Sequence, residues 1–280
     1  MDFFHPNVRG IFRALIAALV IMTLPLTLTL SHAAPLKILL QEEGGSEADS
    51  AGIATRLAAL KKILDKALGR PVEFSATANR ARTVSAMEGN LADIYILQSS
   101  DLASKAVTLL KHSFIAAARP DVNVLFIGFG AKVDTPKAFA GKSIAMPKTD
   151  SSFGQICLGE LRDFGATGVT PHHSNEVGAV IWAVENKVDS VGCIPSSSRM
   201  KDSLAAKKIN VLYEGRLMQT FLVIGSPNLA PADRAALTKA LVSLDESEAG
   251  EASVKPLGLT GFTESGEARL RTLGSFLPVK

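Results

Sequence analysis

Short apolar segments of strand length alternate with amphipathic helical segments along most of this chain, and this alternation limits the folds that it can adopt. In the first half, strands are expected at 35–40, 72–75 and 92–97, with a helix up to residue 68 and another at 80–88 between them. This order predicts parallel βαβ units, in which ligands lie beyond the carboxyl ends of the strands. Those ends carry residues 41–45, 77–79 and 98–100.

The same alternation starts again after a long apolar segment at 122–130. The expected strands lie at 143–146, 168–172, 189–194 and 210–213, and the expected helices at 153–164, 176–186 and 196–206. A strand at 220–225 and helices at 231–244 and 266–277 complete the chain. Two α/β units in tandem imply two lobes with a cleft between them.

Residues 142–165 pass from a short buried strand directly into an amphipathic helix. Ser152 and Gln155 have the spacing of a capping box at a helix start. The free N–H groups of such a start, together with the hydroxyls of Thr149, Ser151 and Ser152, can hold an anion. The alternative is that these polar side chains only cap the helix. As a binding edge, the stretch is expected to be uncharged and rich in hydroxyls.

The N-terminal segment at 1–33 has the pattern of a Sec signal peptide. Arg9 and Arg13 precede an uncharged run at 14–30, and small residues follow it. The expected location is therefore the periplasm, with a retained N-terminal anchor as the alternative. The formal net charge of the 280 residues is only +3, and no basic run is interleaved with aromatic residues. We expect no nucleic-acid partner.

The chain contains two cysteines, Cys157 and Cys193. An oxidising compartment allows them to pair. Cys193 ends an expected strand, and Cys157 lies about one turn into the helix that starts beside that sheet edge, so a disulfide is geometrically reasonable. Two free buried thiols are the alternative.

Several chemical classes lack a readable signal in this sequence. Neither cysteine has a His/Asp partner at a catalytic spacing, and the serines of the helix start have no GxSxG or SxxK pattern, so we expect no enzyme. Adjacent histidines on a strand point to opposite faces, so His172 and His173 do not predict a metal site. No cofactor is expected.

Six segments, in the same order along the chain, resemble the phosphonate-binding-protein family of periplasmic receptors for ABC transporters. They are 68–74, 88–94, 134–145, 183–192, 226–241 and 257–262. The resemblance implies the α/β, two-lobed type II periplasmic binding fold, in which each lobe is a mainly parallel sheet flanked by helices and two crossing strands join the lobes. It assigns 35–122 plus 218–280 to lobe one and 123–217 to lobe two.

The resemblance also implies a function. The chain would close over a small oxyanion, phosphonate-like or phosphate-like, or over a small polar solute, and deliver it to an ABC permease as a monomer. The alternative is a sensory protein that presents the solute to a membrane receptor kinase.

The family holds the anionic oxygens with a Ser-Thr-Ser run at a helix start. Here Ser151 and Ser152 take the first two positions and Phe153 the third, so one hydroxyl is missing. His172 and His173 fall a few residues before the family's histidine, and His173 is the candidate. Across the cleft, the expected ligand-binding residues are Gln98, Ser99 and Ser100.

Overall fold

The computed structural model describes residues 34–43, 50–197 and 199–276, so the predicted signal peptide at 1–33 lies outside the described residues. The described strands form two separate sheets. We call the six-stranded sheet with its helices lobe one, and the five-stranded sheet with its helices lobe two. The two-lobed α/β fold class is confirmed, while the residue-level boundaries between the lobes stay a prediction.

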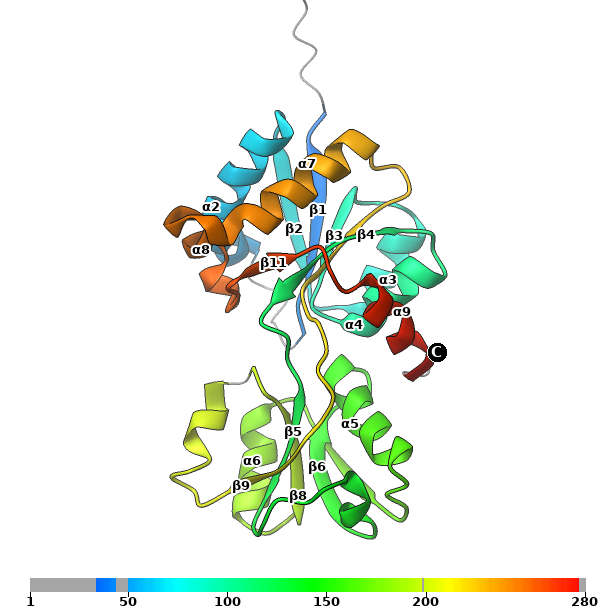
Figure 1. The fold of residues 1–280 in the computed structure, drawn as a ribbon, viewed down its shortest axis with the longest axis vertical. Coiled ribbons are helices and arrows are strands. Elements are labelled where there is room, and N and C mark those ends of the chain that lie inside the picture. Colours follow the sequence, from blue (N-terminus) through cyan, green and yellow to red (C-terminus); the bar gives the residue numbers. More distant parts are fainter. Residues whose placement is uncertain (1–33, 44–49, 198, 277–280) are drawn as a thin grey trace, which may run out of the picture. The chain divides into compact units, whose positions relative to one another are not determined.

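The sheet of lobe one has the strand order β11-β4-β10-β3-β1-β2 (Figure 1). Its strands are β1 (Leu36–Gln41), β2 (Val72–Thr77), β3 (Ile94–Leu97), β4 (Ser113–Arg119), β10 (Leu222–Gly225) and β11 (Gly261–Thr263). β1 pairs in parallel with β2 and β3, whereas β10 runs antiparallel to β3 and β4. The sheet is therefore mixed, because β10 joins it after the chain has returned from lobe two.

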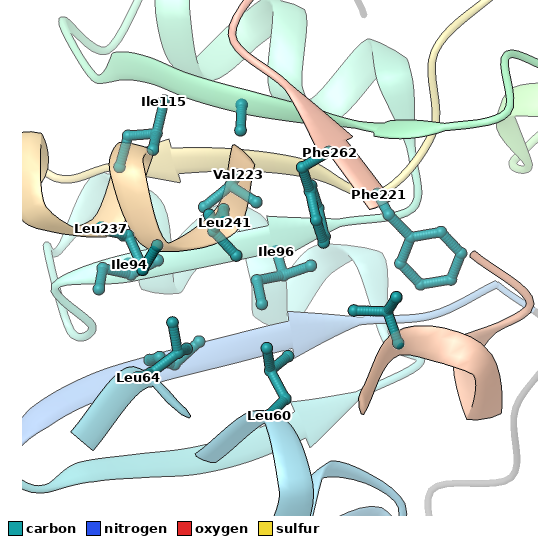
Figure 2. Close-up of a cluster of buried hydrophobic side chains, with 14 of the residues drawn as sticks. Leu60, Leu64, Ile94, Ile96, Ile115, Phe221, Val223, Leu237, Leu241 and Phe262 are labelled. Carbon is teal, nitrogen blue, oxygen red and sulfur yellow. The ribbon is translucent and has the colours of Figure 1, made fainter. Parts of the chain in front are cut away.

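Helices cover both faces of this sheet. They are α2 (Ser50–Leu68), α3 (Arg80–Glu88), α4 (Ser100–Thr108), α7 (Pro231–Val242), α8 (Glu248–Val254) and α9 (Glu267–Phe276). Leu60 and Leu64 of α2 share one buried cluster with Leu241 of α7 and with Ile94 and Ile96 of β3 (Figure 2). The intervening β3 residues, Tyr95 and Leu97, belong to the cluster of the opposite face, which includes residues of α3, α4 and α9. This alternation follows from the two-residue period of a strand.

Lobe two is built in the same way around the strand order β7-β6-β8-β5-β9. Its elements are β5 (Val124–Gly128), β6 (Ser143–Pro147), α5 (Ser152–Asp163), β7 (Thr170–Ser174), α6 (Val177–Glu185), β8 (Val191–Pro195) and β9 (Asn210–Glu214). β6 is parallel to β7 and β8, and β5 is antiparallel to β8 and β9. α5 and α6 contribute to different buried clusters.

Two crossings connect the lobes. They meet in an isolated antiparallel bridge at which the N–H of Val122 donates to the Met218 carbonyl at 2.8 Å and the Met218 N–H donates back at 2.7 Å. The last helix also contacts both lobes: Leu270 of α9 is buried in the core of lobe one, and Leu273 packs against the core of lobe two.

Two local expectations differ from the structure. α4 and β4 fill residues 100–119, for which the sequence pattern suggested no element. The helix expected at 196–206 is only a short 3₁₀ turn, Arg199–Ser203. Most strands of each sheet run in one direction, as expected, but the strand that follows each crossing, β5 or β10, enters its sheet antiparallel to both neighbours.

Candidate functional site

Two loops of lobe one, at the carboxyl ends of β1 and β3, hold each other in place through glutamine side chains. The Gln98 Oε1 atom accepts the backbone N–H of Glu43 at 2.6 Å. In the opposite direction, Oε1 of the fully buried Gln41 accepts the N–H of Ser99 at 3.0 Å. These bonds fix the positions of Glu43 and Ser99 before any solute binds.

The start of α5 is fixed by Ser151 and Gly154. Ser151 has an extended backbone, and its hydroxyl accepts the Gly154 N–H at 3.0 Å, so the cap lies one residue before the Ser152 that the capping-box pattern suggested. A Cβ atom on Gly154 would lie 2.0 Å from the Lys148 carbonyl oxygen, and therefore only glycine fits there. As the first helical residue, Ser152 keeps its N–H and hydroxyl for contacts outside the helix.

Ser152 uses both groups to contact carboxylates of lobe one. Its backbone N–H donates to Oε1 of Glu43 at 2.8 Å, and its hydroxyl donates to Oδ1 of Asp101 at 2.6 Å. The residue is only 1% exposed. The start of α5 is thus the place where lobe two is hydrogen-bonded to the strand-end loops of lobe one.

Arg80 is the cation of this network. It begins α3, which Asn79 caps by accepting the Arg82 N–H at 3.0 Å. One guanidinium nitrogen of Arg80 lies 3.2 Å from Oε1 of Glu43, and the other is paired with Asp101. The guanidinium therefore joins the two carboxylates that Ser152 contacts.

The Glu43 carboxyl group has two unlike oxygen atoms. Oε1 accepts the Ser99 hydroxyl at 2.6 Å in addition to the Ser152 N–H, and Arg80 lies beside it. Oε2 is buried and has no hydrogen-bond partner in the described part of the chain. Burial raises the pKa of Glu43, and the negative charge of Asp101 adds to this, while the bonds from Ser99 and Ser152 and the charge of Arg80 oppose it.

A cavity of about 400 Å³ adjoins this network. Both lobes and the crossings contribute to its wall, whose polar side chains are those of Glu42, Glu43, Arg56, Gln98, Ser197 and Thr220. The apolar part is formed by Pro120, Val122, Phe153, Phe221, Pro256, Leu257 and Leu259. Glu42 is held by an ion pair with Arg56, whose closest N–O distance is 2.6 Å. The volume of the cavity suits a small solute, and its wall suits one with an apolar part and a polar group.

A second cavity, of about 360 Å³, lies between the C-terminal end of α5, the returning crossing and α9. Its wall contains several arginines, but Arg216 is paired with Glu160 and Asp163, and Arg269 with Asp121. Because these charges are matched within the protein, we take the first cavity as the candidate site.

Ser99 and Ser152 are the two hydroxyl residues that the structure brings together from the set expected from sequence, since both donate to the same Glu43 oxygen. Gln98 supports the loop behind them and lines the cavity. Ser100 is buried, and its hydroxyl donates to the Gln219 carbonyl at 2.5 Å.

The other expected residues lie outside this network. Ser151 caps α5, and its hydroxyl also donates to the Lys148 carbonyl at 2.8 Å. Thr149 is exposed. His173 is exposed as well, with Nδ1 3.1 Å from the Pro147 carbonyl oxygen, whereas His172 pairs with Asp189.

Sequence reasoning missed Glu43, Arg80 and Asp101, and with them the charged character of the edge. All three follow expected strands, so their position at the carboxyl ends was a usable signal. The start of α5 remains rich in hydroxyls, but lobe one adds two carboxylates and a guanidinium to it.

The structure joins Cys157 and Cys193 in a disulfide, with their Cα atoms 6.3 Å apart. The bond links α5 to β8, and both residues are fully buried in the core of lobe two. Of the two arrangements left open by the sequence, the bonded one is confirmed.

Two further features concern metal binding and membrane spanning within the described residues. No group of three His, Cys, Asp or Glu side chains there could hold a metal ion. In the same ranges, no helix has the length and apolar character needed to cross a membrane.

The family comparison decides the class of protein. A family model described as "ABC transporter, phosphonate, periplasmic substrate-binding protein" matches residues 46–269. The chain belongs to this family. Members of this phosphonate-transporter family of periplasmic substrate-binding proteins bind solutes and are not enzymes, in agreement with the expected class. The periplasmic location agrees with the family, while the signal peptide itself stays a prediction.

Solved structures share the two-lobed fold. XAC2383 from Xanthomonas citri bound to ATP has a TM-score of 0.70 at 12% identity, over 87% of this chain and 97% of that one. PhnD1 from Prochlorococcus marinus in complex with methylphosphonate has a TM-score of 0.66 at 12% identity, over 86% and 96%. The aliphatic sulphonate binding protein SsuA from Escherichia coli reaches 0.55 at 14%, over 87% and 79%. No curated protein sequence matches the chain.

Proposed function

We propose that this family member binds a small polar solute in the cleft between its lobes, at the start of α5, and delivers it to an ABC permease. The observation that carries the proposal is the pair of bonds by which Ser152 of lobe two contacts Glu43 and Asp101 of lobe one. A solute at this point touches both lobes. Its binding energy therefore favours the arrangement in which they lie together.

Within the set expected from sequence, Ser99 and Ser152 are proposed to act through Glu43, which they hold and which lines the cavity, and Gln98 to shape the cavity wall. The relatives bind methylphosphonate, aliphatic sulphonate or ATP, according to their names. Such solutes share a polar head and differ in the rest, which agrees with a cavity wall that has both polar and apolar side chains. The protein acts as a monomer in this proposal.

The first test identifies the solute. Native mass spectrometry of the protein taken from its own periplasm should show a bound small molecule, and isothermal titration should then give its affinity. Loss of uptake of that molecule when the neighbouring permease gene is deleted would link the protein to transport. Uptake that continues unchanged would contradict delivery to that permease.

The second test locates the site. Ser152→Ala removes the hydroxyl bond to Asp101 and should raise the Kd for the identified solute at least about ten-fold, as expected for loss of a hydrogen bond to a charged group. Thr149→Ala, an exposed residue of the same loop, is the matched control and should bind like the wild type. A Ser152→Ala protein that binds as tightly as the wild type would remove Ser152 from the site.

A further inference from the structure

The start of α5 already holds a carboxyl group, and that group belongs to the protein. The backbone N–H of Ser152, the hydroxyl of Ser99 and the guanidinium of Arg80 converge on one atom, Oε1 of Glu43. These donors come from three different elements. We call them the anion seat, because a helix N–H, a hydroxyl and a cation are the groups that hold the oxygens of a bound anion.

A free oxyanion would have to displace Glu43 to reach the anion seat. Beside the occupied seat it would lie near two carboxylates, Glu43 and Asp101, whose shared cation, Arg80, is already paired with both. The negative charges of Glu43 and Asp101 would repel the oxyanion and disfavour its binding. The arrangement therefore selects against a solute whose only polar group is an anion.

The second carboxyl oxygen of Glu43, Oε2, lacks a hydrogen-bond donor within the ranges that the structure describes. Oε2 is buried without a hydrogen-bond partner among the described residues, and Glu43 lines the cavity of about 400 Å³. Without a donor at Oε2, burial raises the pKa of Glu43, and a cationic donor that reaches this oxygen would stabilise the ionised carboxylate. The protein side supplies donors to Oε1, so the donor to Oε2 is expected from the solute.

We propose, on the basis of the function proposed above, that Glu43 determines specificity: it fills the anion seat and accepts a primary ammonium or amidinium group of the solute at Oε2. The apolar wall around Phe153, Phe221 and Leu257 then contacts the rest of the solute. The solute class is a small amine with an apolar part.

The test compares two kinds of probe by isothermal titration against the wild type and two Glu43 variants. The anionic probes are methylphosphonate and inorganic phosphate, and the amine probes are ethanolamine, propylamine and putrescine. Glu43→Gln places an amide nitrogen or a neutral oxygen where the ammonium would bind, so at least one amine that binds the wild type should lose affinity ten-fold or more. Glu43→Ala empties the anion seat and should bind an anionic probe at least ten-fold more tightly than the wild type does.

Glu73→Gln is the matched control, because Glu73 of β2 is an exposed residue of the same lobe that carries the same charge and lies outside the cavity wall. It should leave both kinds of probe at wild-type affinity. Wild-type protein that binds methylphosphonate or phosphate as tightly as Glu43→Ala overturns the inference while the proposed function stands. Amine affinity unchanged in Glu43→Gln does the same. If no probe binds any of the four proteins, the amine inference fails, while the proposed function is decided separately by the solute that native mass spectrometry finds.

Discussion

Breaking the disulfide between Cys157 and Cys193 should destabilise lobe two by an amount that follows from the length of chain that it encloses. The two residues are 36 apart in sequence. In the chain-entropy description, closing a loop of this length in the unfolded state raises the free energy of unfolding by about 4 kcal/mol. For a chain of this size, about 4 kcal/mol corresponds to a lower Tm by roughly 8–16 °C.

Chemical reduction and mutation together distinguish the stabilising effect of the disulfide bond from that of the two buried sulfur atoms. Reduced wild-type protein keeps both sulfur atoms, so its difference from the oxidised protein in urea unfolding measures the bond alone. Cys157→Ala with Cys193→Ala also removes buried atoms from the core, and should be less stable than the reduced wild type by about 1 kcal/mol more. This double variant is also the control for the reductant, which should not change its stability.

Breaking the disulfide should change the affinity for the solute much less than it changes the free energy of unfolding. The bond acts mainly on the unfolded chain, and the start of α5 is fixed independently by the Ser151 cap and by the close approach of Gly154 to Lys148. Solute affinity of the reduced protein at a temperature well below its Tm should stay within about two-fold of the oxidised value. Equal unfolding free energies for oxidised and reduced protein would refute this reasoning, as would two free thiols in denatured, unreduced protein.

Three further predictions concern single residues. Gly154→Ala places a Cβ against backbone and should cost about 3 kcal/mol or more in urea unfolding, whereas Gly178→Ala, which meets only the Met200 side chain at 3.4 Å, should be neutral or stabilising. Because burial raises the pKa of Glu43 above its ordinary 4.5, its contribution to stability is present below pH 4.5 and is lost as the pH rises through the raised value. Wild type should therefore lose stability relative to Glu43→Gln as the pH rises above 4.5; a constant difference would contradict this. Arg216→Ala leaves Glu160, 1% exposed, without its guanidinium, and should cost about 2 kcal/mol, discounted for the partly exposed arginine; unchanged thermal unfolding would count against the pair.

The parts of the fold that sequence reasoning predicted are those set by local periodicity. Strand and helix periods are readable within a few residues, which is why β1, α2, β2, α3 and β3 were placed in the right order. The segment at 196–206 shows the limit of that reasoning. It has polar residues and few apolar anchors, and it forms only a 3₁₀ turn.

The candidate site also has some residues that local sequence patterns predicted and others that they did not. Ser152 was predicted because a helix start is a local pattern, and Ser99 because it follows a strand. The contacts of Glu43 and Asp101 with Ser152 span 109 and 51 residues, so they depend on how the lobes and loops pack. The sequence shows which loops meet at a sheet edge. It does not show which side chain of a loop points into the site, because neighbouring residues decide that. Gln98, for example, fixes the backbone of Glu43 by accepting its N–H.

The C-terminal helix gives this receptor a way to change affinity without changing specificity. Leu273 of α9 packs against the buried cluster that lobe two shares with Val122 and Met218 of the crossings, although its helix belongs to lobe one, so this contact depends on how the lobes are arranged and lies outside the proposed binding network. The apparent Kd is the intrinsic Kd divided by the fraction of molecules in the binding-competent arrangement. Substitutions at the end of the chain would therefore set how much solute is needed for capture, while residues at the start of α5 set which solute is captured. Selection could tune the two properties independently.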